Sequence, residues 1–228
     1  MLKDTYLQAQ SLQIGLKARI IVIMASRNTI REYAPNAYYH IYNRGVEKRQ
    51  IFKDKEDYAV FLAMLKRHLD SQEHKDKSGR VYRRYPDIEL LAYCLMPNHY
   101  HLFLYQKNDP KAFTELLRSV GTAYTAYFNR KYNRVGHLYQ ERFRASRILS
   151  DNYLQHISRY IHLNPVKPFE YQWSSINYYL DNQHSDWMNT TRVLQEFSMD
   201  PNKYRLFLED YQDERNMLNE IKYSLANY

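Results

Sequence analysis

Cysteine and glycine are scarce in this sequence, with one cysteine and five glycines among 228 residues. The single cysteine, Cys94, excludes an internal disulfide, and its apolar surroundings predict a buried thiol that fits a reducing cytoplasm. The few glycines argue against a low-complexity chain. The longest apolar run near the start, residues 20–25, is far shorter than the roughly 20 residues of a membrane span, and the segment before it is too polar for a secretory signal. We therefore expect a cytoplasmic globular protein without a membrane segment.

Positive charge and tyrosine are abundant instead. The net charge is +8, and the chain contains 24 tyrosines. Residues 34–185 hold 23 Lys and Arg against 15 Asp and Glu, whereas residues 186–228 hold 5 against 8. A basic body with interleaved aromatic side chains favours a polyanionic partner, nucleic acid first, although solubility alone would also account for the charge. We expect a main domain over 34–182, an N-terminal extension over 1–33 and a C-terminal helical appendage over 183–228.

The spacing of apolar residues predicts an α+β fold. Strands are expected over 36–44, 88–96, 99–105 and 141–149, and helices over 54–69, 109–132, from Ser150 or Asp151 to no further than Asn164, and around 203–225. The first six elements, in the order strand, helix, strand, strand, helix, strand, match a ferredoxin-like sandwich, an antiparallel sheet with two helices on one face. Both faces of the 99–105 strand are largely apolar, so the third helix can cover the other face.

Two histidines, His99 and His101, lie two residues apart in a predicted strand. Because side chains alternate across a strand, both imidazoles project from one face, and Tyr100 between them points into the opposite layer. Two neutral imidazoles a few ångströms apart can chelate a divalent ion. Such pairs also occur as plain hydrogen-bonding groups, and two imidazoles leave the coordination incomplete. A third ligand would have to come from elsewhere in the fold.

The helix that must end before Pro165 has an apolar stripe beside a polar-aromatic one. The polar-aromatic stripe consists of Tyr153, His156, Tyr160 and Asn164. Tyr160 and Asn164 are one turn apart on the same side, so a nucleophilic hydroxyl and an amide oxygen ligand can face the same ion. With 24 tyrosines in the chain, composition alone favours an ordinary helix residue with its hydroxyl at the surface.

Four segments together resemble the HUH single-strand nucleases, most closely the single-tyrosine transposases that include the REP-associated tyrosine transposases. The segments are YHIYNRG at 39–45, LMPNHYHLFL at 95–104, GHLYQERFRA at 136–145 and SRYIHLNPVK at 158–167. His99, Tyr100 and His101 match the His-hydrophobe-His pattern, with tyrosine at its centre. Tyr160 matches the nucleophile of the family, and Asn164 matches the third metal ligand.

The resemblance implies a transesterase of single-stranded DNA. Tyr160 would attack a phosphate and hold the 5′ end as a phosphotyrosine, with a divalent metal, Mg²⁺ or Mn²⁺, bound by His99, His101 and Asn164. Two imidazoles and an amide oxygen suit these ions, and the positive charge would offset the weak nucleophilicity of a phenol with a pKa near 10. The resemblance also implies hairpin-bearing DNA as the partner. It leaves open whether the protein is a monomer or a homodimer, and whether the tyrosine helix acts in cis or in trans.

Basic and polar residues near these segments are candidates for DNA contact, because basic groups follow phosphates while aromatic rings stack on bases. The resemblance also implies recognition of a short guide sequence, partly through the N-terminal strand region, which makes Asn43 and Arg44 candidate readers of bases. The full set of DNA-contact candidates is Asn43, Arg44, Lys48, Arg49, Arg130, Lys131, Arg134, Arg142 and Arg144.

Other functions compete with a transposase-like enzyme. A non-catalytic regulator derived from a transposase would bind repeat DNA without cutting it. A plasmid replication initiator or relaxase would use the same chemistry, but the motif around Tyr160 matches the transposases better. An RNA-binding ferredoxin-like domain would carry a recognisable aromatic signature on its strands, which this sequence lacks.

Overall fold

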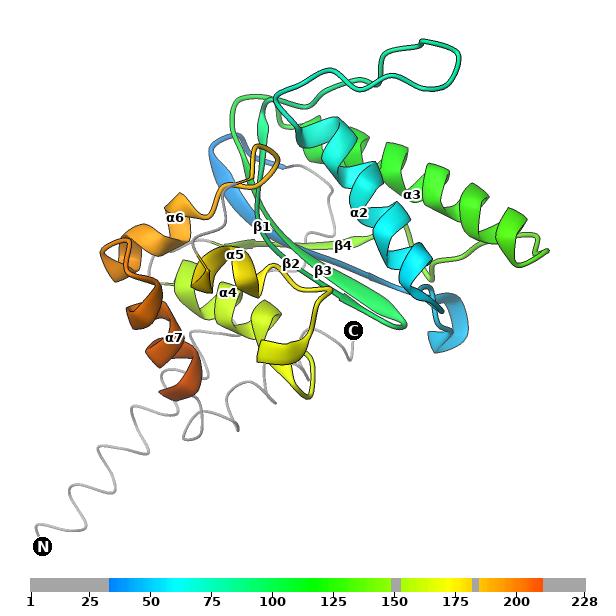
Figure 1. The fold of residues 1–228 in the computed structure, drawn as a ribbon. Helices are drawn as coiled ribbons and strands as arrows, with labels where there is room; N and C mark the ends of the chain where they lie inside the picture. Colours follow the sequence, from blue (N-terminus) through cyan, green and yellow to red (C-terminus); the bar gives the residue numbers. More distant parts are fainter. Residues whose placement is uncertain (1–32, 149–152, 182–184, 211–228) are drawn as a thin grey trace, which may run out of the picture.

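The computed structural model describes residues 33–148, 153–181 and 185–210. A four-stranded antiparallel sheet runs through it, with helices on both faces (Figure 1). The strands are β1 (Ala37–Arg44), β2 (Ile88–Met96), β3 (His99–Gln106) and β4 (Arg144–Ile148), and their order in the sheet is β2-β3-β1-β4. Helix α2 (Lys55–Leu69) joins β1 to β2, and α3 (Ala112–Lys131) joins β3 to β4. This connectivity confirms the ferredoxin-like α+β fold predicted from the sequence.

The remaining helices follow β4 along the chain. They are α4 (Leu154–His162), α5 (Ile176–Leu180), α6 (Thr191–Leu194) and α7 (Pro201–Glu209), with short 3₁₀ turns at Val46–Lys48, Pro168–Glu170 and Gln195–Phe197. The predicted cap of the tyrosine helix, at Ser150 or Asp151, lies outside the described residues. The predicted helix around 203–225 corresponds within them to α7, and its continuation also lies outside them.

Two predicted boundaries were wrong. Helix α3 begins at Ala112 rather than at Asp109, because the Asp109 carboxylate accepts the backbone N–H of Lys111 and closes a turn before the helix. Strand β4 begins at Arg144 rather than at residue 141, because the carbonyls of residues 141 and 142 accept hydrogen bonds from the Asn43 side chain at 3.0 and 2.6 Å. In both places a side chain competes with the regular backbone pattern.

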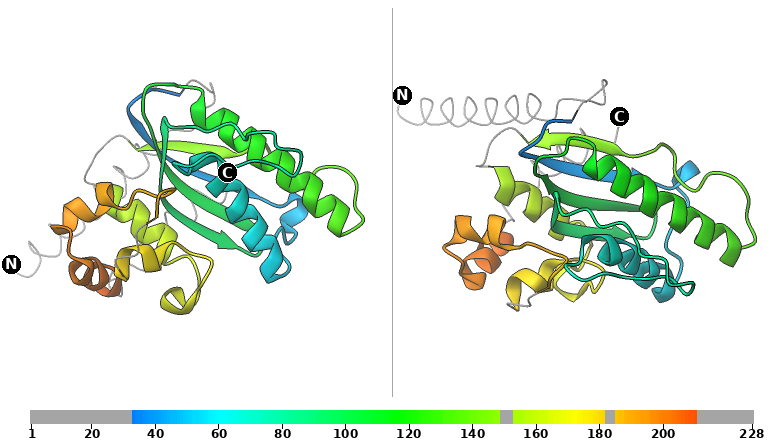
Figure 2. Two further views of the ribbon diagram at one scale, coloured as in Figure 1. Left: turned by 45° about the horizontal axis from the view of Figure 1, so that its top comes forward. Right: turned by 90° about the horizontal axis from the view of Figure 1, so that it is seen from above.

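Each face of the sheet has its own core. Helices α2 and α3 pack on the face that carries Tyr39, Ile41 and Tyr100. Helices α4 to α7 pack on the opposite face, against Cys94 and Phe103 (Figures 1 and 2). The prediction that the sheet is covered on both sides is confirmed. No helix in the described part of the chain is long and apolar enough to cross a membrane.

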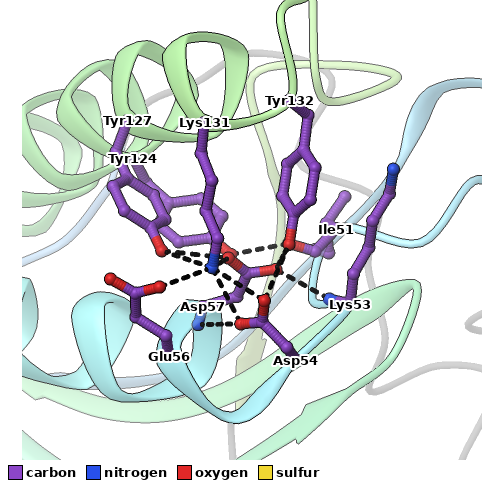
Figure 3. A network of polar contacts seen from close by, with 9 residues as sticks. All are labelled: Ile51, Lys53, Asp54, Glu56, Asp57, Tyr124, Tyr127, Lys131 and Tyr132. Atoms are coloured by element: carbon purple, nitrogen blue, oxygen red, sulfur yellow. Dashed lines mark hydrogen bonds and ion pairs between the residues drawn. The ribbon is translucent and has the colours of Figure 1, made fainter.

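Ionic contacts join α2 to α3 at one end of the pair (Figure 3). Lys131 Nζ lies 2.8 Å from carboxylate oxygens of Asp54 and Glu56 and 2.9 Å from Asp57. The carboxylate of Asp57 is fully buried. It also accepts the backbone N–H of Lys53 and the hydroxyls of Tyr127 and Tyr132. We call Lys131 and its three carboxylates the lysine clamp.

The outer edge of β2 is covered by later parts of the chain. The backbone N–H of Leu95 donates to the carbonyl of Trp173 at 2.9 Å, and that of Ser175 donates to Tyr93 at 3.0 Å. Further along the same edge, the N–H of Asn189 donates to the carbonyl of Leu90 at 2.9 Å. The segments between α4 and α7 are therefore tied to the sheet by backbone hydrogen bonds as well as by side-chain packing.

Candidate active site

Strand β3 carries the predicted histidine pair at its first and third positions. The ring centroids of His99 and His101 lie 5.0 Å apart on one face of the sheet, whereas Tyr100 packs into the core on the other face. His101 is buried and His99 is half-buried. The shared face expected from strand alternation is confirmed, and metal binding remains a prediction.

Both histidines of the pair have their Nδ1 atom engaged by a neighbouring side chain. His99 Nδ1 lies 2.6 Å from the amide oxygen of Asn98. His101 Nδ1 lies 2.9 Å from Nε2 of His40, a fully buried residue of β1. An ion bound by either ring would therefore have to take its Nε2 atom. Protein histidines commonly bind metal in this way, with the second nitrogen held by a hydrogen bond.

Helix α4 brings Tyr160 against the histidines from the same chain. The Tyr160 ring meets the rings of His101 and His40 edge-on, with centroid distances of 5.4 and 5.6 Å and interplanar angles of 81° and 82°. Only 3% of Tyr160 is exposed, so it is not the surface residue that composition alone favoured. Burial raises the pKa of the Tyr160 phenol, Tyr42 adds to the rise, and a hydrogen bond with Asn164 opposes it.

Asn164 lies just beyond α4 and not within it. The helix ends at His162, and the backbone N–H of Asn164 reaches the carbonyl of Ile161 at 3.4 Å. The helical conformation is disfavoured for Asn164 because Pro165 follows it. Even so, its side chain is near enough to Tyr160 to lower the pKa of that phenol. His99 and Asn164 are half-buried, whereas His101, Tyr160 and His40 are buried.

The donor set of this site is mixed. Among the described residues, no group of three or more His, Cys, Asp or Glu side chains is placed to hold a metal ion. A metal site on β3 would therefore combine the two imidazoles with a different ligand, and the candidate is the amide of Asn164, which acts on the pKa of the neighbouring Tyr160. Two imidazole nitrogens and one amide oxygen, with positions left for phosphate oxygens or water, fit Mn²⁺ or Mg²⁺.

A line of buried polar side chains holds α4 in place. His162 Nδ1 lies 2.7 Å from the Tyr204 hydroxyl of α7, which donates to Ser158 Oγ at 3.0 Å. On its other side, His162 Nε2 lies 2.8 Å from Ser175 Oγ, before α5. All four side chains are fully buried, and burial lowers the pKa of His162 to about 3, so the line is uncharged. We call these four hydrogen-bonded residues, Ser158, His162, Ser175 and Tyr204, the Tyr204 chain. It holds α4 through Ser158 and His162, which flank Tyr160, and so fixes the position of the helix.

Several predicted DNA-contact residues gather at the His99 end of the site. Arg44 pairs with His99 across β1 and β3, and Arg144 pairs with Tyr42 across β1 and β4. The backbone N–H of Gly45 donates to the carbonyl of Asn98, and that of Gln140 donates to Arg44. The loop after β1, the turn before β3 and the segment before β4 therefore meet here. Arg44, Lys48, Arg49, Arg142 and Arg144 lie on these segments, and Lys48 and Arg142 are exposed.

Three of the other four predicted contact residues have partners within the protein. Asn43 is buried and its amide holds the backbone before β4, which leaves it turned away from solvent. Lys131 belongs to the lysine clamp, and Arg134 donates to the side chain of Asn129 at 2.8 Å. Arg130 is exposed on α3. Contact of these four residues with DNA remains a prediction.

Three residues of the site, His40, Tyr42 and Asn98, were not predicted from the sequence to have a role there. His40 and Asn98 hold the histidine pair, and Tyr42 stacks on His40 with ring centroids 5.5 Å apart. The alternation of β1 did place His40 and Tyr42 on one face. Their meeting with β3 depends on a strand register between residues 61 positions apart, for which the sequence gives no signal.

Comparison with known proteins places the chain in a family. The family model described as Transposase IS200 like matches residues 33–164. Among solved structures, a REP-associated tyrosine transposase bound to a REP hairpin is similar, with 18% sequence identity, a TM-score of 0.49, and coverage of 70% of this chain and 90% of that chain. No protein of curated function matches significantly. Because the family model matches more than half of the chain, the protein belongs to the IS200-like transposase family.

Proposed function

We propose that the protein is a metal-dependent nuclease and strand transferase of single-stranded DNA that acts through a 5′-phosphotyrosine on Tyr160. The observation that carries the proposal is the edge-on packing of Tyr160 against His101 at 5.4 Å, with Asn164 near enough to the same phenol to lower its pKa. One chain thus brings together a nucleophile and the side chains suited to a divalent ion. Membership of a transposase family supports the reaction class.

The proposed reaction exchanges one phosphodiester bond for another. Tyr160 Oη forms a bond to phosphorus as the bond from phosphorus to the 3′ oxygen breaks. The phenol loses its proton, and the departing 3′ oxygen gains one. A 3′-OH then attacks the phosphotyrosine and regenerates the phenol. The number of phosphoester bonds is unchanged, so the reaction needs no nucleotide cofactor.

The surrounding residues prepare this exchange. Because burial raises the pKa of Tyr160, its phenol is protonated and weakly nucleophilic at neutral pH. A divalent ion held by His99, His101 and Asn164 would polarise the phosphate oxygens and stabilise the charge that develops. The packing of Tyr160 on His101 and His40 fixes its ring beside the histidines, and a phosphate would approach from the side of the half-buried His99 and Asn164.

The proposed substrate is a single strand that carries a hairpin. The exposed and half-buried cations around the His99 end of the site would contact the phosphate backbone, and salt would weaken their binding. The resemblance to the REP-associated transposases extends to hairpins in repeat sequences. We therefore propose an inverted repeat that folds into a hairpin as the cognate DNA.

The test uses the purified full-length protein and a labelled single strand that contains such an inverted repeat. With Mn²⁺, the wild type should leave protein covalently attached to the 5′ end, which a denaturing gel resolves, and a chelator should abolish the product. The Tyr160→Phe variant should form at least about 10³-fold less covalent adduct than the wild type, since it lacks the nucleophile. Tyr153→Phe, on the same helix, is the matched control and should react as the wild type does.

Two results would overturn the proposal. Cleavage by Tyr160→Phe at the wild-type rate would show that another group attacks the phosphate. Tight hairpin binding without any covalent product, across the full range of metal concentrations, would instead establish the non-catalytic regulator.

A further inference from the structure

The two predicted ligand histidines are held by partners with different chemistry. The amide oxygen of Asn98 can only accept, so it requires a proton on His99 Nδ1. The Asn98 amide nitrogen donates to the carbonyl of Lys48 at 3.3 Å, which fixes the orientation of this amide. Asn98 therefore sets one tautomer of His99, the one that leaves a lone pair on Nε2.

The partner of His101 can either donate or accept. A neutral imidazole carries one proton, and His40 Nε2 lies 2.9 Å from His101 Nδ1. If Nε2 of His40 holds the proton, His101 must carry its own proton on Nε2 and cannot bind an ion there. If His101 Nδ1 holds the proton, His40 accepts it and His101 Nε2 presents a lone pair. Metal binding by His101 therefore requires His40 to act as the acceptor.

His40 is built into the floor of the site. It is fully buried, and within the described part of the chain its Nδ1 atom has no hydrogen-bond partner. Burial away from water disfavours the charged form of the ring, which leaves the neutral imidazole able to accept a hydrogen bond. Its ring stacks on His101 with an interplanar angle of 17° and meets the edge of Tyr160. An apolar ring would pack in this position without leaving a buried nitrogen unpaired, so packing alone does not account for a histidine.

We propose that His40 is the positioning residue of the metal site: it accepts the Nδ1–H of His101, directs Nε2 of that ring to the ion, and supports the edge of Tyr160. The proposal rests on the proposed function, since it assigns His101 to the metal. Its chemical content is a buried neutral imidazole that selects the tautomer of a ligand imidazole. Partners of this kind commonly change metal affinity by 10- to 100-fold when they are removed.

Two substitutions of His40 test its hydrogen-bond acceptor and its aromatic ring separately. His40→Phe keeps an aromatic ring against Tyr160 but removes the acceptor. His40→Gln removes the ring but can place an amide oxygen where His40 Nε2 lies. We expect His40→Phe to weaken Mn²⁺ binding by about 10- to 100-fold and His40→Gln to stay within about threefold of the wild type. Electron paramagnetic resonance of free Mn²⁺ measures this affinity without DNA or turnover, and thermal unfolding checks that each variant is folded.

A measurement on the wild type keeps the proposal falsifiable if a variant does not fold. With saturating Mg²⁺, ¹H–¹⁵N correlation spectra of the histidine rings should show the proton of His101 on Nδ1. A proton on Nε2, equal Mn²⁺ affinity of His40→Phe and wild type, or an equal loss in both variants would each overturn the role of His40. If wild-type protein binds Mn²⁺ and forms the DNA adduct in those cases, the proposed function still stands. If wild type does neither, the proposed function and the role of His40 both fail.

Discussion

On the α2–α3 face of the sheet, Lys131 contacts three carboxylates, whereas on the α4–α7 face four uncharged side chains are joined inside the core. The carboxylates of the lysine clamp lie across the sheet from the histidine pair, so they do not face an incoming phosphate. The Tyr204 chain fixes α4 without placing a charge beside Tyr160. The comparison indicates that Lys131 joins α2 to α3 through ions, whereas the side chains that hold α4 beside the site are uncharged.

The largest expected effect comes from the lysine clamp. Asp57→Ala removes a fully buried carboxylate and leaves Lys131 and two tyrosine hydroxyls without their common acceptor. We expect the free energy of unfolding to fall by about 3–5 kcal/mol, as for other broken buried ion pairs. Denaturant titration measures it. Glu56→Gln, at the exposed side of the clamp, is the control and should cost at most about 1 kcal/mol. Equal costs for both variants would contradict the assignment of Asp57 as the centre of the clamp.

A smaller loss is expected on the other face. Tyr204→Phe removes the hydroxyl between His162 and Ser158 and should cost about 1–3 kcal/mol. Tyr124→Phe is a matched control on the α2–α3 face, where the hydroxyl donates to the carbonyl of Ile51 at 2.6 Å. Hydrogen exchange should accelerate in α4 only in Tyr204→Phe. Faster exchange of α4 in both variants would mean that the two faces do not open separately.

The two faces should also respond differently to acid. Burial lowers the pKa of His162 from 6.5 to about 3, so between these values the unfolded chain binds a proton that the folded chain does not. Stability around α4 should therefore fall as the pH falls through this window, by up to about 1.4 kcal/mol per pH unit. The hydrogen bond from Lys131 lowers the pKa of Asp54 below its ordinary value of 3.8. The contribution of Asp54 to stability is therefore present above pH 3.8 and is lost only as the pH falls further.

Hydrogen exchange at pH 7 and pH 5, corrected for the intrinsic rate, measures this difference. Residues 154–162 should open more at pH 5, whereas the clamp residues at 54–57 should not. The region for comparison is the clamp end of α2, because burial also lowers the pKa of His68 at the other end of that helix. His162→Gln should reduce the response of α4 without abolishing it, because burial also lowers the pKa of His40, which packs against Tyr160. An unchanged response would exclude His162 as a source.

The smallest effect is expected for a single exposed cation. Arg142→Gln should weaken binding of single-stranded DNA by about two- to fivefold. It should also reduce the slope of the logarithm of the binding constant against the logarithm of the salt concentration by about 0.7, the value for one lost phosphate contact. Fluorescence anisotropy at several salt concentrations measures both. Lys77→Gln is the control, since residue 77 lies in the loop before β2, at the opposite end of that strand from the histidine turn. A change of the same size in this control would mean that net charge alone drives binding.

Much of the fold was predictable because its signals are local. The alternation in β1 and β3, the Pro97–Asn98 turn and the helical spacing of α2 each lie within a few residues. The starts of α3 and β4 were missed because Asp109 and Asn43 hold the adjoining backbone through their side chains. Such competition is not visible in apolar periodicity.

The site was predictable in two separate parts. Strand alternation placed His99 and His101 together, and helical spacing related Tyr160 to Asn164. Neither pattern could bring α4 onto β3, and only the resemblance to a family linked the two parts. The role of His40 depends on strand register and on the tautomer of a neighbouring ring, and neither property is encoded in spacing along the chain.

The backbone hydrogen bonds at the outer edge of β2 also determine which segment two copies of the protein could exchange. If α4 alone moved to a partner subunit, it would leave Tyr204 and Ser175, the hydrogen-bond partners of its buried His162, behind. Buried polar groups would lose their partners on both sides of the break. An exchange would therefore have to carry α4 to α7 as one piece, whose edge contacts with β2 could then be rebuilt on the neighbour.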